Sequence, residues 1–326
     1  MIDRRAEKRA AEKWNAVAKP LHGLGKLEES LIRIAGIQGS ENIALERRAI
    51  LVFCADNGIV AQGVTQTGSH VTALVADNIA EGKASVNRMC AQCGRKIDVF
   101  AIDMGIRDAV RSPRIIPRRI AAGTRDFSVE PAMSEAQARK AIETGVGLVR
   151  EYRDRGYTIL GTGEMGIGNT TTSSALLSVL LDMDPELVTG RGAGLTTAGY
   201  NRKVQVIREG IRIRKPSGED PVDALSKVGG LDLAALTGFY IGCAACGLPV
   251  VLDGLITGAA ALAAVRICPD VKGYLLASHV SAEPAGAMVL DALGLKPAIS
   301  AGMCLGEGTG AAALFPLLDM AAAVYT

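Results

Sequence analysis

The densest group of residues able to do chemistry lies at 161–172, where the sequence is GTGEMGIGNTTT. This segment leaves an apolar run and leads into a helical pattern. Its backbone N–H groups and the helix N-terminus can therefore form a seat for an anion. We predict a phosphate or ribose-phosphate site here, and the residues expected to form it are Gly166, Ile167, Gly168, Asn169 and Thr170.

The same segment has the spacing G-x-G-x-x-G at Gly161, Gly163 and Gly166, which is typical of dinucleotide-binding turns. A dinucleotide site also needs a second strand that ends in an acidic residue about 20 residues later. Here the helical pattern continues through residues 173–185 instead. The hypothesis of an NAD-dependent oxidoreductase is therefore supported by this spacing alone, and we favour a phosphate site.

Two further clusters could take part in the same chemistry. The turn GRGAG at 190–194 precedes a helical segment with Lys203, so Gly192 and Lys203 are candidates for phosphate binding. Glu307 lies in LGEGTG (305–310), within an apolar region, and desolvation there should raise the pKa of its carboxyl group. A raised pKa suits a general base that works near neutral pH. The alternative is that Glu307 caps the last helix, because acidic residues favour helix N-termini.

These clusters lie among short apolar runs that alternate with longer helical segments. The runs lack the polar alternation of half-exposed strands, which favours strands buried on both faces of a parallel sheet. They are residues 49–55, 96–103, 157–162, 248–254 and 273–278, and the helical segments are 70–92, 134–155 and 169–181. We predict an α/β fold: a mostly parallel, Rossmann-like sheet with helices on both faces.

Ligands of such sheets bind at the carboxyl ends of the strands. Those ends carry Asp56-Asn57-Gly58, Asp103-Met104-Gly105, Gly161 to Gly168, Asp253-Gly254 and Ser278-His279. We expect an α/β nucleotide-binding and catalytic domain at 49–308. Residues 1–48 and 309–326 are expected to form a small helical domain together.

Composition excludes several classes of protein. The chain has 36 Lys and Arg against 34 Asp and Glu, a net charge of +2 without a basic stripe, so we expect no nucleic-acid partner. The uncharged run 233–252 is long enough to span a bilayer, but Gly238, Gly242, Gly247 and Pro249 interrupt it. We therefore expect no membrane span. Since the first residues have no apolar signal core, we also expect a cytoplasmic protein.

The cysteines give no metal signal. The pairs Cys90-x-x-Cys93 and Cys243-x-x-Cys246 lie too far apart along the chain for an ordinary zinc ribbon. In helical segments rich in Ala and Gly, such cysteines are usually small core residues. We predict neither a metal nor a cofactor.

Eight segments together resemble the nicotinate-nucleotide–dimethylbenzimidazole phosphoribosyltransferase family, which builds the lower-ligand nucleotide of cobamides. They are KPLHGLGKLE (19–28), VFCADNGIVAQGV (52–64), GEMGIGNTTT (163–172), GRGAGL (190–195), ALSKVGGLDLAALTG (224–238), GLPVVLDG (247–254), SHVSAEP (278–284) and LGEGTGAA (305–312). The combination of GEMGIGNTT with LGEGTGA is highly specific, and the resemblance covers nearly the whole chain.

The resemblance implies transfer of the ribosyl phosphate of nicotinate mononucleotide to an aromatic lower-ligand base, with inversion at C1′ and release of nicotinate. It implies that Glu307 is the general base and that Glu164 is a second functional carboxylate near the ribose. Gly166, Lys203 and Ser281 map onto positions around the phosphate. The side of the cavity that takes the acceptor would contain Thr67, Val75, Met165 and Leu305.

The chain departs from the family pattern mainly on the acceptor side. Asn57 stands where the family usually has His, Thr67-Gly68-Ser69 replace a Ser-Pro-Lys segment, and Val75 replaces Gln. Loss of that amide removes a hydrogen bond to an azole, so acceptor choice stays open. The leading hypothesis is that dimethylbenzimidazole is the acceptor. The second hypothesis is that phenol or p-cresol is the acceptor and that the chain works as one subunit of a heterodimer. A third is that the chain is a non-catalytic partner subunit. We expect a dimer, with itself or with a similar chain.

Overall fold

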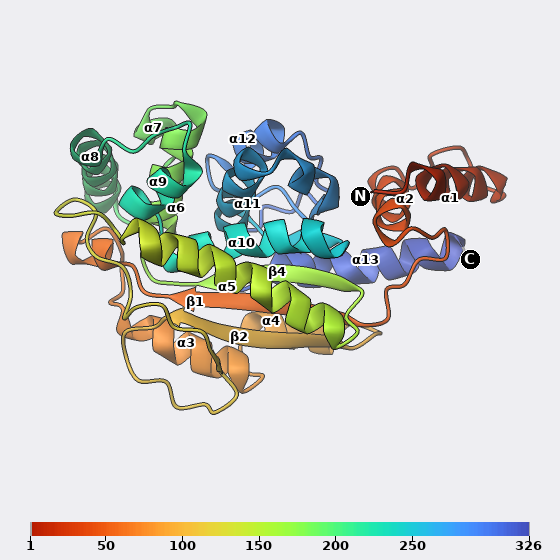
Figure 1. Cartoon of the computed structure of the whole chain (residues 1–326), viewed down its shortest axis with the longest axis horizontal. Helices are drawn as coiled ribbons and strands as arrows, with labels where there is room; N and C mark the ends of the chain where they lie inside the picture. Colours follow the sequence, from red (N-terminus) through yellow and green to blue (C-terminus); the bar gives the residue numbers. More distant parts are fainter. Residues whose placement is uncertain (1, 326) are drawn as a thin grey trace.

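A computed structural model of the chain describes residues 2–325, which form one parallel sheet between two layers of helices (Figure 1). The strand order is β3-β2-β1-β4-β5-β6, so strand order reverses between β1 and β4. The strands are β1 (Arg48–Ala55), β2 (Ile97–Gly105), β3 (Ile116–Pro117), β4 (Ile159–Met165), β5 (Val250–Leu252) and β6 (Leu275–Ala277). All five pairings are parallel, and the predicted α/β fold is confirmed.

Strand β1 shows why the run at residues 49–55 has no polar alternation. All eight of its residues are buried, because β2 and β4 flank it and helices cover both faces. Leu51 and Phe53 belong to one hydrophobic core, whereas Ile50 and Val52 belong to the other. This alternation follows from the period of two in a strand. Both sets must therefore be apolar, and no polar face remains.

One layer of helices covers the face that carries Phe53. It comprises α5 (Glu135–Asp154), α6 (Asn169–Leu181), α9 (Pro221–Val228), α10 (Leu231–Cys246), α11 (Leu255–Ile267) and α12 (Gly286–Leu293). The rings of Phe53 and Phe239 meet edge to face with centroids 5.4 Å apart. Two helices, α7 (Pro185–Val188) and α8 (Thr197–Arg214), extend this layer beyond α6.

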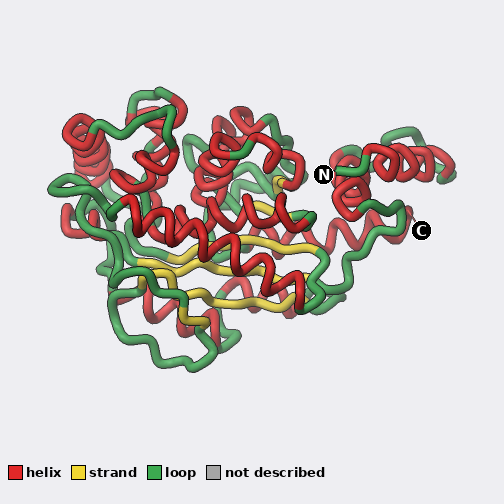
Figure 2. The backbone as a smooth tube through the Cα atoms, viewed as in Figure 1, coloured by secondary structure: helices red, strands yellow, loops and turns green. Residues whose placement is uncertain are grey.

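The opposite face of the sheet is covered by α3 (His70–Ala80), α4 (Ser85–Ala91) and α13 (Thr309–Tyr325). Helices α1 (Arg4–Ala16) and α2 (Lys26–Gln38) pack near the C-terminal end of α13. Short 3-10 helices occupy Gly58–Gln62 and Pro269–Tyr274. Figure 2 shows the strands in yellow between the helical layers, with both termini at the same end.

The predicted elements match this arrangement closely. The helical segment 70–92 divides into α3 and α4, and 134–155 and 169–181 correspond to α5 and α6. Strand β3 was not predicted, because a two-residue edge strand leaves too short an apolar pattern to detect.

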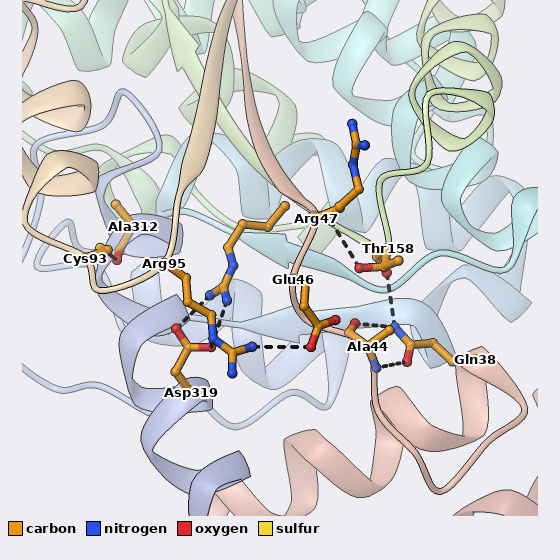
Figure 3. A network of polar contacts seen from close by, with 10 residues as sticks. Gln38, Ala44, Glu46, Arg47, Cys93, Arg95, Thr158, Ala312 and Asp319 are labelled. Atoms are coloured by element: carbon orange, nitrogen blue, oxygen red, sulfur yellow. Dashed lines mark hydrogen bonds and ion pairs between the residues drawn. The ribbon is translucent and has the colours of Figure 1, made fainter.

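The terminal helices are tied to the sheet by a polar network as well as by apolar packing. The rings of Trp14 and Tyr325 lie 5.1 Å apart. The buried Arg48 makes two hydrogen bonds with Asp319 of α13, at 2.7 and 3.1 Å, and Arg95 lies between Asp319 and Glu46 (Figure 3). Because α13 also packs against β4 and β5, its core is continuous with that of the sheet. The division into two domains stays a prediction.

The uncharged run 233–252 is buried inside the protein. It forms most of α10 and strand β5, and α10 packs lengthwise on α5. An added Cβ at Gly238 would overlap the carbonyl oxygen of Ile142, so the two helix backbones touch. The run thus lacks charge because it lies between other elements. No helix within residues 2–325 is long and apolar enough to cross a bilayer.

This contact predicts a large difference between two Gly→Ala substitutions in the same helix pair. Gly238→Ala should lower the free energy of unfolding by about 3 kcal/mol or more, because both backbones would have to separate. Gly147→Ala, on the exposed side of α5 with open space around it, should raise it by up to about 1 kcal/mol. Urea denaturation of both variants tests this. Equal stabilities would contradict the close helix contact.

Candidate active site

A cavity of about 240 Å³ opens at the carboxyl ends of the strands, where strand order reverses between β1 and β4. This is the place where open α/β sheets bind ligands. Its walls come from the loops that follow β1, β4, β5 and β6, from the turn at 191–195 and from the segment 304–307. The three clusters found in the sequence therefore meet in one cavity.

The N-terminus of α6 forms one end of this cavity. The helix begins at Asn169 and has Gly168 as its N-cap, with φ of +93° and no side chain to cap the first turn. Gly168, Asn169 and Thr170 all line the cavity. An added Cβ at Gly166 would overlap the carbonyl oxygen of Ala55, so only glycine lets the turn pass over the end of β1. The N–H groups of Asn169 and Thr171 already donate to the carbonyl oxygens of Gly166 and Gly168, and the anion seat stays a prediction.

Lys203 lies directly behind this end of the cavity. Its side chain is 1% exposed, and Nζ donates hydrogen bonds to Thr170 Oγ1 (2.9 Å) and to the carbonyl oxygen of Gly190 (3.1 Å). It thereby connects α6 with the second glycine-rich turn, although it does not itself line the wall. Burial lowers the pKa of Lys203 to about 8, while the Glu283 carboxylate opposes the shift.

A group of buried acidic residues forms the middle of the site. The Asn169 side-chain amide donates hydrogen bonds to Glu164 Oε2 and to Asp232 Oδ2, the latter at 3.2 Å. Burial, reinforced by the nearby Asp232 and Asp253 carboxylates, raises the pKa of Glu164 to about 8. Burial likewise raises the pKa of Asp232 and of Asp253 to about 6. At neutral pH Glu164 is thus mostly protonated.

Glu307 approaches the cavity from the loop before α13. Its φ is +61°, and Gly306 and Gly308 on either side both have φ of +90°. The Glu307 carboxylate accepts the N–H of Val86, the second residue of α4, at 3.1 Å. An added Cβ at Gly163 would lie 2.5 Å from the carbonyl carbon of Glu307, so the loop rests directly on β4.

The two carboxyl groups of the site lie in different surroundings. The side chain of Glu307 is half-buried, whereas Glu164 is fully buried and its pKa is raised to about 8. Glu307 stands two residues before the last helix, but its carboxylate accepts an N–H in the first turn of α4. Sequence order could not show either fact, because β4 and α4 meet this loop only in the folded chain.

Apolar side chains form another part of the cavity wall. Val75 from α3, Met165 from the end of β4 and Leu305, which is 57% exposed at the rim, all line it. Of the predicted site residues, thirteen line the cavity: Thr67, Val75, Glu164, Met165, Gly166, Ile167, Gly168, Asn169, Thr170, Gly192, Ser281, Leu305 and Glu307. Lys203 lies behind the wall. The roles of all these residues stay predictions.

Comparisons with known proteins agree with this site. A family model described as DBI_PRT, phosphoribosyltransferase, matches residues 1–326. The chain belongs to this phosphoribosyltransferase family. It is 42% identical over 311 residues to the nicotinate-nucleotide–dimethylbenzimidazole phosphoribosyltransferase of Acetivibrio thermocellus, covering 95% of this chain and 88% of that protein. Over 325 residues it is also 42% identical to the protein of the same name from Escherichia coli O127:H6, covering 99% and 90%.

Solved structures in the same phosphoribosyltransferase family support the fold. CobT from Thermus thermophilus superposes with a TM-score of 0.93 at 36% identity, covering 98% of this chain and 96% of that one. The family resemblance read from the eight motifs is thus confirmed. In this family member, the position where the pattern usually has His is Asn57, which is buried under the glycine-rich turn and donates to the carbonyl oxygens of Ala55 and Ile167.

Sequence reasoning assigned no role to three residues at the site of this phosphoribosyltransferase. Asp253 and His279 were noted only as strand ends, yet both line the cavity. Asp232 was not singled out, although it is the only charged residue in the buried helix α10. A carboxylate in such a helix needs a polar partner, and that is the signal that could have identified it.

Two other strand-end carboxylates serve local structure instead. Asp56 accepts the N–H of Arg107 at 2.7 Å, and Asp103 accepts the N–H of Ile106 at 2.8 Å. Across the described residues 2–325, no three His, Cys, Asp or Glu side chains are grouped to hold a metal ion.

The raised pKa of Glu164 predicts a pH dependence of stability. The folded state holds this proton up to about pH 8, whereas the unfolded chain releases it near its ordinary value of 4.5. The free energy of unfolding should therefore fall as pH rises from about 5 to 8, by an amount on the order of a few kcal/mol from this group. Glu164→Gln should remove that part of the slope.

Urea denaturation at pH 5.5 and 8.5 measures this slope. Glu143→Gln, which removes an exposed carboxylate of α5, is the matched control and should leave the slope as it is in the wild type. An unchanged slope in Glu164→Gln would show that Glu164 ionises freely in the folded protein.

Proposed function

We propose that this protein transfers the phosphoribosyl group of nicotinate mononucleotide to an aromatic base such as dimethylbenzimidazole. The observation that carries the proposal is the meeting of two features in one cavity. The α6 N-terminus with Lys203 behind it can hold a phosphate, and Glu164 and Glu307 lie beside it. The activity named for the relatives needs both features.

The positive charge of Lys203 supports the proposed phosphate site. Lys203 makes no ion pair with a carboxylate among residues 2–325, and two of its three N–H donors go to neutral oxygen atoms. The Glu283 carboxylate acts on Lys203 only from beyond ion-pair distance. A buried cation without a direct ion pair is costly, so an anionic ligand at the α6 N-terminus would stabilise it. Thr170 and Gly192 lie next to Lys203 and line the cavity, and with Gly168 they would contact the phosphate.

The protonated Glu164 is suited to bind the ribose. Its Oε2 already accepts a hydrogen bond from Asn169, which leaves Oε1 to carry the proton. A protonated carboxyl group can donate a hydrogen bond to a ribose hydroxyl. It also adds less negative charge than an ionised group would beside the other carboxylates. Two acidic groups in different surroundings can in this way take different roles.

In the transfer itself, the C1′–N bond of the nucleotide breaks and its electron pair neutralises the pyridinium ring, which leaves as nicotinate. A nitrogen of the acceptor attacks C1′ from the opposite face, so the β linkage becomes α. Glu307, which faces the same cavity, takes the proton that the acceptor loses. The reaction consists of one bond made, one bond broken and one proton moved.

The apolar part of the cavity wall fits a flat aromatic acceptor, and the choice of acceptor is left to experiment. Val75 offers no hydrogen bond to a second ring nitrogen, which favours an acceptor with a single polar group, such as phenol or p-cresol, as the second candidate. We also propose that the protein is cytoplasmic and that it forms a dimer, either a homodimer or a heterodimer with a similar chain. Light scattering of the purified chain measures the oligomeric state.

A product assay tests the proposed reaction. The purified chain is given nicotinate mononucleotide with dimethylbenzimidazole, adenine, phenol or p-cresol, and each product is identified by mass. We expect a ribotide of at least one acceptor, and Glu307→Gln should lower kcat by about 10²- to 10⁴-fold, as for loss of a general base. A chain inactive alone but active with a similar chain would indicate the heterodimer. Inactivity under both conditions would refute the reaction.

Lys203→Met tests the phosphate site separately. The substitution keeps an apolar stem of similar length but removes the charge, so KM for nicotinate mononucleotide should rise about 10- to 100-fold. The preference for the mononucleotide over the riboside should fall by the same factor. Arg208→Met, which removes an exposed cation from the same helix α8, should change neither value. A retained preference in Lys203→Met would place the phosphate elsewhere.

A further inference from the structure

The loop that carries Glu307 is held by a carboxylate from a different part of the chain. Asp253 follows strand β5 and is 3% exposed. Its Oδ2 accepts the N–H of Gly308 at 2.9 Å, and its Oδ1 accepts the N–H of Gly310 at 2.7 Å. Both carboxylate oxygens are therefore hydrogen-bonded to the backbone immediately after Glu307.

These two hydrogen bonds replace a local helix cap. Helix α13 begins at Thr309, and the residue before it, Gly308, has no side chain with which to cap the first turn. A carboxylate at a helix N-terminus satisfies free N–H groups and complements the helix dipole. An added Cβ at Gly310 would lie 2.7 Å from Asp253 Oδ1, so glycine is needed for this approach.

The loop needs these stabilising hydrogen bonds because its backbone conformation is strained. Gly306, Glu307 and Gly308 have consecutive positive φ angles, a region that glycine enters freely but that is unfavourable for glutamate. On the N-terminal side, the carbonyl oxygen of Gly306 accepts hydrogen bonds from the backbone N–H and the hydroxyl of Thr309. On the C-terminal side the contact comes from Asp253.

We infer that Asp253 is a positioning residue that fixes Glu307 in its left-handed conformation and thereby aims the Glu307 carboxylate at the cavity. The inference rests on the proposed function, in which Glu307 takes the acceptor's proton. Asp253 acts through the backbone of the loop, and its effect on the reaction passes through Glu307. Residues that act as one unit in this way show strongly non-additive losses.

Asp253→Asn is the direct test. Asparagine keeps the shape, but its amide nitrogen would face a backbone N–H, so one hydrogen bond becomes a contact between two donors. We expect kcat to fall by about 10²-fold, the effect of misplacing a catalytic group by about 1 Å, while KM for nicotinate mononucleotide stays nearly constant. Amide hydrogen exchange at Gly308 and Gly310 should become faster, as read from a 305–314 peptide.

Asp220→Ala is the matched control for loss of a cap. Asp220 caps α9 through the N–H groups of Val222 (2.9 Å) and Asp223 (3.2 Å), away from the cavity. This variant should lower the midpoint of thermal unfolding by a few degrees and leave kcat at the wild-type value. If both variants lost activity in proportion to stability, Asp253 would be a structural residue only, and the inference would fail.

The double variant Asp253→Asn/Glu307→Gln separates positioning from direct contact. If Asp253 acts through Glu307, the double variant has the residual rate of Glu307→Gln. A further loss of about 10²-fold would mean that Asp253 touches the substrate itself and would overturn the inference. If Glu307→Gln kept the wild-type rate, the proposed base would be wrong. Hydrogen exchange in Asp253→Asn would then decide whether Asp253 holds the loop. Unchanged exchange at Gly308 and Gly310 would show that it does not, and the whole inference would fail.

Discussion

The reversal of strand order between β1 and β4 is the constraint on which the rest of the structure depends. From β1 the chain moves outward to β2 and β3, and from β4 it moves outward in the other direction to β5 and β6. The connections on the two sides lead to opposite layers of helices. The crevice between them at the carboxyl ends of the strands cannot be closed by either layer. The N-terminus of α6, the acidic residues and the apolar side chains of the site all line that crevice.

Backbone contacts made possible by glycine give this crevice its shape. The Glu307 loop rests on β4 at Gly163, and the turn before α6 rests on the end of β1 at Gly166. Away from the site, α5 and α10 touch at Gly238. Close contacts of this kind leave little room for side chains to adjust, so the positions of functional groups follow from the course of the backbone. A chain with 38 glycines and few aromatic residues is suited to such packing.

Burial then gives similar side chains different properties. Glu164 and Glu307 both line the cavity, but Glu164 is enclosed with Asp232 and Asp253, and its pKa is raised to about 8. Glu307 reaches the cavity half-exposed from a loop and has a backbone N–H as its partner. Lys203 is enclosed and makes no ion pair among the described residues, and burial lowers its pKa to about 8. Low dielectric surroundings strengthen each of these effects.

The fold class, the three clusters at 161–172, 190–203 and 305–310, and the family could all be predicted from the amino-acid sequence. Strand periodicity, glycine spacing and motif identity depend on residues that are close together in the sequence, so they can be recognised without a structure. The tertiary structure alone decided that Glu164 has the raised pKa, that Asp232 shares Asn169 with it, and that Asp253 caps the helix after Glu307. Desolvation and hydrogen bonding depend on which atoms meet in space, and these groups come from segments far apart along the chain, such as Asn169 and Asp232, which are 63 residues apart.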